Sequence, residues 1–179
     1  MERQPLRTPV EVRLLDASDS IEELTDLLHR AYAPLAVMGF RYVATHQDAA
    51  RTRQRVGGGR ECYVAVQDGR IVGTVTFRNA SLTRGCPWYD RPDVCSFGQF
   101  AVEPPLQRRG IGSRLMDVCE RRAVETGAAE LALDTAEGAD HLIDLYRRRG
   151  FRFVEHTRWP EVNYRSVIMS KRVGNSADG

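Results

Sequence analysis

The sequence predicts a single domain of the α/β (α+β) class, with a mixed central sheet of about six or seven strands and about four helices. Three observations support this fold class. The 179 residues are 42% apolar and 28% charged, as expected for one globular core. An antiparallel hairpin pattern stands in the first half of the chain. A strand, a helix and a second strand follow one another in the second half, which predicts a parallel βαβ unit.

A strand is expected ahead of residue 20, followed by two helices. Ser20-Ile21-Glu22-Glu23 has the form of a capping box, and apolar residues recur behind it at helical spacing. This pattern predicts a helix over residues 20–32 that ends at Pro34. A second, more polar helix is expected over residues 45–56, where three glycines follow.

The clearest strand signal lies between residues 62 and 77. Apolar residues alternate over 62–66 and again over 71–77, and Asp68-Gly69 separates the two runs. Asp-Gly between alternating runs is typical of a β-hairpin. Residues 79–93 hold Gly85, Pro87 and Pro92 and are therefore predicted to form a loop.

The second half alternates strands and helices and closes with two strands. Glycines end both predicted helices, and Pro104-Pro105 ends the first strand. The expected elements are a strand over 95–102, a helix over 110–126, a strand over 129–135, a helix over 139–149, and strands over 151–158 and 163–171.

Charge, length and apolar runs exclude several classes of protein. The net charge of +2 is too balanced to indicate nucleic-acid binding, although Lys171 is the only lysine among the 26 basic residues. No apolar run is long enough to cross a membrane, and residues 1–9 have no apolar segment typical of a secretory signal. We therefore expect a cytoplasmic protein with an N-terminal extension (1–9), one domain (10–172) and a disordered tail (173–179).

The four cysteines do not indicate a metal site. They form no Cys-x-x-Cys pair, and no histidine lies at a zinc-ligand spacing from them. We expect reduced, mostly buried thiols, and the sequence leaves open whether Cys86 and Cys95, which flank one loop, interact.

The most informative segment is the turn between the strand over 95–102 and the helix over 110–126. It contains Gln107, Arg108 and Arg109, with Gly110 and Gly112 at the helix start. Helix N-termini bind anions through free N–H groups, and glycines allow close approach of the backbone. The turn is no P-loop, because no Gly-Lys-Ser/Thr follows, and it lacks the third glycine of a dinucleotide-binding turn. Taken alone, these residues are equally compatible with a tight structural turn.

The wider context resolves this ambiguity. Val102-x-Pro104-x-x-Gln107-x-x-Gly110-Ile111-Gly112-x-x-Leu115 resembles the acyl-CoA-binding motif of the GNAT N-acetyltransferase superfamily. Leu145-Tyr146 with Gly150-Phe151 resembles the second hallmark of that superfamily. Motif order, separation and element pattern all match over about residues 10–172, and the sequence is identified as a member.

The resemblance implies acetyl-CoA as the cofactor, no metal, and direct transfer to an amine in a ternary complex. A splayed pair of parallel strands would open a slot for the thioester. The first of these strands would bind the pantetheine arm, and the N–H of Val102 would polarise the acetyl carbonyl. The implied pantetheine-binding residues are Phe100, Ala101 and Val102. The implied pyrophosphate-binding residues are Gln107, Arg108, Arg109, Gly110, Ile111, Gly112 and Ser113.

Two residues take catalytic roles by resemblance. Tyr146 matches the general acid that protonates the leaving thiolate, although the residue alone also suits a core aromatic. Asp134 matches a carboxylate late in the second splayed strand that accepts the proton of the amine. Glu103 is a weaker candidate for that role. The first splayed strand has no carboxylate or imidazole over residues 96–99, and the asparagine that often contacts the cofactor is absent from residues 138–140.

The acceptor is not named by the sequence. Aromatic and acidic residues in the expected acceptor segments suit a cationic amine, such as an aminoglycoside, a polyamine or an amino acid. The predicted acceptor residues are Tyr32, Trp88, Tyr89, Asp90, Trp159 and Tyr164. A small-molecule acceptor, including an antibiotic, is the leading hypothesis, and neither nucleic acid nor membrane is expected as a partner. A protein N-terminal amine, a non-catalytic acyl-CoA-binding regulatory module and a homodimer remain open alternatives.

Overall fold

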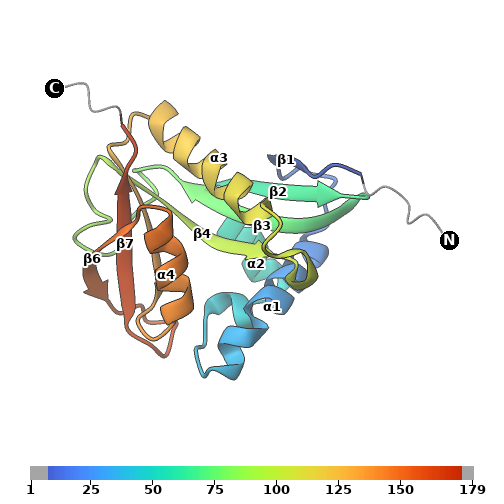
Figure 1. Cartoon of the computed structure of the whole chain (residues 1–179), viewed down its shortest axis with the longest axis horizontal. Helices are drawn as coiled ribbons and strands as arrows, with labels where there is room; N and C mark the ends of the chain where they lie inside the picture. The colour runs from blue at the N-terminus through green and yellow to red at the C-terminus, as the bar shows by residue number, and fades with distance from the viewer. Residues whose placement is uncertain (1–7, 175–179) are drawn as a thin grey trace.

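The computed structural model describes residues 8–174, which form one seven-stranded sheet. Helices cover both faces of this sheet (Figure 1). The strand order is β1-β2-β3-β4-β5-β7-β6, and all neighbours are antiparallel except the parallel pair β4–β5. This confirms the predicted fold class. The strands are β1 (Glu11–Leu14), β2 (Glu61–Gln67), β3 (Arg70–Arg78), β4 (Val94–Val102), β5 (Glu130–Ala136), β6 (Arg152–Thr157) and β7 (Ser166–Arg172). The α-helices are α1 (Ile21–Val37), α2 (Ala49–Val56), α3 (Ile111–Glu125) and α4 (Asp140–Arg148).

Helices on opposite faces of the sheet enclose two main cores. In Figure 1, α3 and α4 lie in front of the sheet and α1 and α2 lie behind it. The front core joins Leu115 and Cys119 of α3 to Phe97 of β4 and Leu131 of β5. The rear core packs the leucines of α1 against β2 and β3. The loop over residues 79–93 covers the rear face of β5 and β7, where Tyr89 is almost wholly buried.

The first two helices differ from the prediction at their ends. Helix α1 continues through Pro34 to Val37, because the next residue, Leu35, is buried and its packing offsets the hydrogen bond that proline cannot donate. Helix α2 begins only after Asp48, whose side chain caps it by accepting from the N–H of Arg51 at 2.7 Å.

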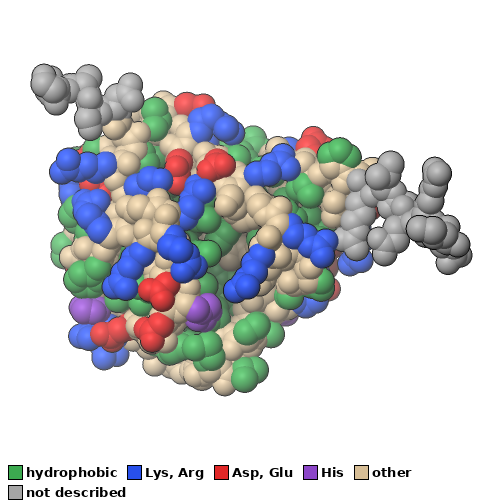
Figure 2. Space-filling model, viewed as in Figure 1, with side chains coloured by type: hydrophobic (Ala, Val, Ile, Leu, Met, Phe, Trp, Pro, Cys, Tyr) green, Lys and Arg blue, Asp and Glu red, His purple; other side chains and the backbone are tan. Residues whose placement is uncertain are grey.

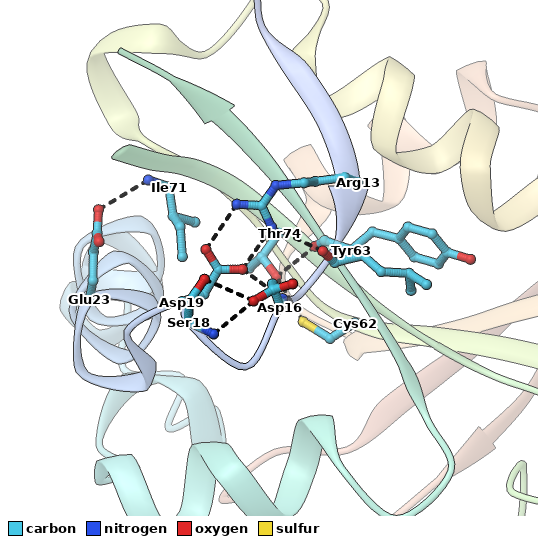
Figure 3. A network of polar contacts seen from close by, with 10 residues as sticks. Arg13, Asp16, Ser18, Asp19, Glu23, Cys62, Tyr63, Ile71 and Thr74 are labelled. Carbon is cyan, nitrogen blue, oxygen red and sulfur yellow. Dashed lines mark hydrogen bonds and ion pairs between the residues drawn. The ribbon is translucent and has the colours of Figure 1, made fainter. Parts of the chain in front are cut away.

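The predicted capping box at the start of α1 is only half formed. The Ser20 hydroxyl accepts from the N–H of Glu23 at 3.1 Å, as expected. The Glu23 carboxylate, however, accepts from the N–H of Ile71 in β3 at 3.0 Å (Figure 3). A second connection in the same view is the two-point ion pair of Arg13 with Asp19, at 2.7 and 2.9 Å. Together these contacts join α1 to the β2–β3 hairpin and the turn before α1 to β1.

The remaining general expectations concern the chain ends and the cysteines. Most of the predicted extension (1–9) and tail (173–179) lies outside the described residues. Residues 8–174 contain no helix with the length and apolar character needed to cross a bilayer. All four cysteines are free and buried. In the same part of the chain, no group of three His, Cys, Asp or Glu side chains could hold a metal ion.

Candidate active site

A bulge in β4 opens the middle of the sheet. Opposite β3, Thr74 pairs with Ala101 and Thr76 with Gly98, so two residues of β4 oppose one of β3. One of these two, Gln99, has a φ of 47°, a left-handed conformation that only a few non-glycine residues adopt. A bulge bends the strand that carries it. The pairing of β4 with β5 stops at Ser96 and Ala132, just ahead of this bend, and β4 has no partner on that side from there on.

The strand then delivers the chain to the turn before α3. Arg108 and Gly110 have φ values of 62° and 85°, which let the backbone fold tightly ahead of the helix. Among the described residues, the N–H groups of residues 108–113 have no acceptor. No atom lies within 4 Å of where a Cβ on Gly110 would stand. Free N–H groups, a helix N-terminus and open space fit a phosphate group.

Basic side chains gather beside this turn. Figure 2 shows Lys and Arg side chains around a hollow between α3 and α4. Exposed arginines of the turn, the first turn of α3 and the end of α4 include Arg108, Arg109, Arg114, Arg147 and Arg148. They complement an anion held at the helix N-terminus.

Gly112 has a different role from the one its motif suggests. A Cβ at this position would stand 3.0 Å from the Phe100 ring and 3.6 Å from Val102. The glycine therefore lets the first turn of α3 pack directly on the end of β4. Close packing, rather than access of an anion to the backbone, is what requires glycine here.

Where β4 and β5 separate, a pocket of about 350 Å³ opens between them. Its lining includes residues that the sequence predicts for the site and others that it does not. The sequence-predicted lining residues are Phe100, Tyr32, Tyr89, Asp134, Tyr146, Trp159 and Tyr164. We call this cavity the β4–β5 pocket.

Asp134 is held in the pocket by two aromatic donors. The Tyr89 hydroxyl donates to Oδ1 and the Trp159 indole Nε1 donates to Oδ2, each at 3.0 Å. The two rings stack with centroids 6.0 Å apart. Gly85 provides the space for this stack, because a Cβ on it would stand 2.8 Å from the indole. Burial and the Asp134 charge raise the pKa of Tyr89 well above its ordinary value, so it stays a donor.

Tyr146 lines the same pocket from α4. Its ring packs edge-on against Phe97 and Phe151, with centroids 6.3 and 6.1 Å away. No residue in the described range hydrogen-bonds its hydroxyl, although the side chain is only 6% exposed. Burial raises the pKa of Tyr146 well above its ordinary value. The phenol therefore keeps its proton at neutral pH and is free to donate it into the pocket.

Other predicted acceptor residues divide into two groups. Tyr32 and Tyr164 line the pocket, and Tyr42, which the sequence analysis did not select, packs against both rings. Trp88 and Asp90 do not line it. Trp88 lies beneath the Arg91 guanidinium at 4.2 Å, and Asp90 accepts from the N–H of Gly85 at 3.0 Å within its own loop.

The charge of the pocket does not favour the cationic amine that the aromatic and acidic residues of the sequence suggested. Its carboxylates are Asp134 and Glu161, and Glu161 is ion-paired with Arg51. Its arginines are Arg51, Arg55, Arg60, Arg78 and Arg84. They come from α2, from β3 and from the segments beside these elements, which carry no recognisable motif. The pocket is therefore cationic.

Comparisons with known proteins agree with this geometry. A family model described as "Acetyltransferase (GNAT) family" matches residues 21–151. The S-(2-succino)cysteine N-acetyltransferase of Bacillus subtilis (strain 168) is 33% identical over 137 residues, which cover 73% of this chain and 77% of that protein.

Solved structures share the fold at low sequence identity. The ribosomal-protein-S18-alanine N-acetyltransferase from Escherichia coli matches with a TM-score of 0.68 and 17% identity, over 96% of this chain and 98% of that one. An aminoglycoside 6′-N-acetyltransferase complexed with coenzyme A matches with a TM-score of 0.67 and 14% identity, over 94% and 99%.

Proposed function

The chain belongs to the GNAT family of acetyltransferases, and from that membership we propose that it acetylates the amine of an amino acid bearing additional carboxylates. It is an acetyl-CoA-dependent N-acetyltransferase. We take S-(2-succino)cysteine as the model acceptor.

The observation that carries the proposal is the cationic β4–β5 pocket. Five arginines line it against two carboxylates, so it favours an anionic acceptor and disfavours a polycationic one. S-(2-succino)cysteine has one amine and three carboxylates, and the relative named for this acceptor is 33% identical to the chain. Asp134 is the acidic group to which the ammonium of such an acceptor would bind.

When bound, acetyl-CoA supplies the acetyl group as a thioester. We assign the free N–H groups of residues 108–113 to its pyrophosphate, with Arg108 and Arg109 adding positive charge. The edge of β4 from Phe100 to Val102, which has no strand partner on the β5 side, is assigned to the pantetheine arm. The Val102 N–H is assigned to the acetyl carbonyl oxygen, where it stabilises developing negative charge.

We assign the proton transfers to two residues of the pocket, Asp134 and Tyr146. Asp134 orients the acceptor ammonium and takes its proton, directly or through water, so that the amine can attack. Tyr146 gives its proton to the departing sulfur. A covalent cysteine route is disfavoured, because burial raises the pKa of all four thiols, that of Cys86 to about 12. We therefore propose that the acetyl group passes directly from acetyl-CoA to the amine in a ternary complex.

The cofactor assignment predicts a large effect of Gly112→Val. The added side chain overlaps the Phe100 ring and forces α3 away from the end of β4, which displaces the free N–H groups. Overpacking of this kind costs about 1–3 kcal/mol, which corresponds to roughly 5- to 150-fold weaker binding of acetyl-CoA. Calorimetry measures this affinity. Gly174→Ala, at a site where a Cβ meets only a carbonyl at 3.9 Å, is the matched control. Unchanged binding in Gly112→Val would contradict the assignment.

The acceptor proposal is tested by thiol release from acetyl-CoA with a panel of amines. We expect S-(2-succino)cysteine to give the highest kcat/KM, ahead of S-ethylcysteine, spermidine, kanamycin and a peptide with a free N-terminus. N-acetyl-S-(2-succino)cysteine, which lacks the free amine, should release no thiol. A preference for spermidine, kanamycin or the peptide would overturn the proposal, as would the absence of turnover with every amine.

A further inference from the structure

We infer that Arg55 and Arg78 form a carboxylate-binding pair in the β4–β5 pocket that selects the acceptor by its side-chain dicarboxylate. The inference rests on the proposed function for its substrate, and it adds which groups recognise that substrate.

Arg78, the last residue of β3, is the more exceptional of the two. Its Nε is fully buried and has no hydrogen-bond partner in the described part of the chain. Its guanidinium lies 5.9 Å from the centre of the Tyr89 ring, near the Asp134 wall. Gly98 of β4 lies beside the guanidinium, and a Cβ on it would stand 3.5 Å from Nη2. The absence of a side chain at Gly98 leaves the pocket side of the guanidinium open.

Arg55 reaches the same pocket from α2. Its Nη1 donates to the side-chain oxygen of Gln47 at 2.6 Å. Gln47 is itself fixed, because its amide nitrogen donates to Thr52 at 2.7 Å and to Gln99 at 3.0 Å. Gln99 belongs to the β4 bulge. The orientation of Arg55 is thus set by the same bulge that opens the pocket.

Neither guanidinium is neutralised by the protein. Among the lining arginines, Arg51 is ion-paired with Glu161, whereas Arg60 and Arg84 donate to the backbone carbonyls of residues 57 and 90. Each carboxylate oxygen of Asp134 accepts a hydrogen bond from an aromatic donor, Oδ1 from Tyr89 and Oδ2 from Trp159. Over residues 8–174, no ion pair joins Arg55 or Arg78 to a carboxylate.

Two half-buried cations that line one pocket without a carboxylate partner are unfavourable unless a ligand supplies the counter-charge. The nearest chemical match is a pair of carboxylates on one short carbon chain, because each guanidinium binds one carboxylate through two parallel hydrogen bonds. A succinyl group has this form. With its dicarboxylate on Arg55 and Arg78, the acceptor can still present its ammonium to Asp134.

The kinetic test compares Arg55→Gln and Arg78→Gln with Arg53→Gln, an exposed position on the same helix α2 that lies outside the pocket. With S-(2-succino)cysteine, we expect KM to rise about 10- to 150-fold in each pocket variant, the effect of losing a charged hydrogen bond, with a smaller change in kcat. With S-ethylcysteine, which lacks the dicarboxylate, the pocket variants should match the parent protein. Arg53→Gln should behave as the parent with both acceptors.

A binding test separates this inference from the proposed function. Succinate is titrated into the protein by calorimetry, without acetyl-CoA and without turnover. We expect binding to the parent protein and its loss in the Arg55→Gln/Arg78→Gln double variant, whose fold is checked by circular dichroism. If amino acids are acetylated but neither KM nor succinate binding depends on these arginines, the inference is wrong and the proposed function stands. If succinate binds through them but no amino acid is acetylated, the proposed function is wrong and the pair stands.

Discussion

Tyr146→Phe is expected to lower turnover by about 10²- to 10⁴-fold, the usual contribution of a general acid. The substitution removes one hydroxyl and keeps the ring that packs between Phe97 and Phe151. Because no residue in the described range hydrogen-bonds that hydroxyl, its loss breaks no internal contact. Stability and acetyl-CoA affinity should therefore stay close to those of the parent protein, and only the step that protonates the leaving sulfur should slow.

The matched control is Tyr63→Phe. Tyr63 lies on β2, outside the pocket, and donates to Glu61 at 2.7 Å. Its loss should leave kcat unchanged. The pH profile gives a second readout, because burial raises the pKa of Tyr146 and so keeps it protonated beyond its ordinary range. Its titration should not lower parent turnover up to about pH 10. Near-full turnover in Tyr146→Phe would show that the thiolate leaves unassisted.

Asp134→Asn is expected to lower kcat/KM by about 10²- to 10⁴-fold, as for loss of a general base. Asparagine has one acceptor oxygen, whereas Tyr89 and Trp159 donate to two oxygens of Asp134. The variant therefore loses the proton acceptor and leaves one buried donor unsatisfied, which costs a further ~1–3 kcal/mol of stability.

The pH dependence separates the two effects. Raising the pH converts acceptor ammonium to free amine, so kcat/KM of Asp134→Asn should recover toward alkaline pH, while the lost stability should not. Trp159→Phe keeps the carboxylate but removes one donor, and it reports on the positioning of Asp134 alone. An unchanged kcat/KM in Asp134→Asn across the pH range would exclude Asp134 as the proton acceptor.

Local patterns were sufficient to predict most of the fold. The hairpin at Asp68-Gly69 and the parallel unit around α3 depend on residues close in sequence, and both are confirmed. The errors occur where distant packing overrides local preference. Helix α1 passes Pro34 because Leu35 is buried against residues far along the chain.

The candidate site could be predicted from the sequence only in part. Tyr146 and the turn before α3 were selected by motifs and Asp134 by its place late in a strand, and the structure brings Tyr146 and Asp134 to one pocket. Arg55 and Arg78 have no motif, and in a chain with so many arginines nothing in the sequence distinguishes them. Trp88 and Tyr89 are adjacent and similar in character, yet only Tyr89 faces the pocket. Only the three-dimensional path of their loop determines which one does.

The bend in β4 also affects the mechanics of the molecule. Beyond Ser96 the sheet consists of two parts, β1–β4 and β5–β7. Their backbones are hydrogen-bonded only along the short parallel pairing of β4 with β5. By contrast, β5 and β7 pair along the whole of β5. Local stability follows such differences in hydrogen bonding, so we expect the sheet to flex at this short pairing. A ligand that contacts both parts of the sheet would restrain this motion, and the first ligand to bind would then lower the entropic cost of ordering the protein for the second.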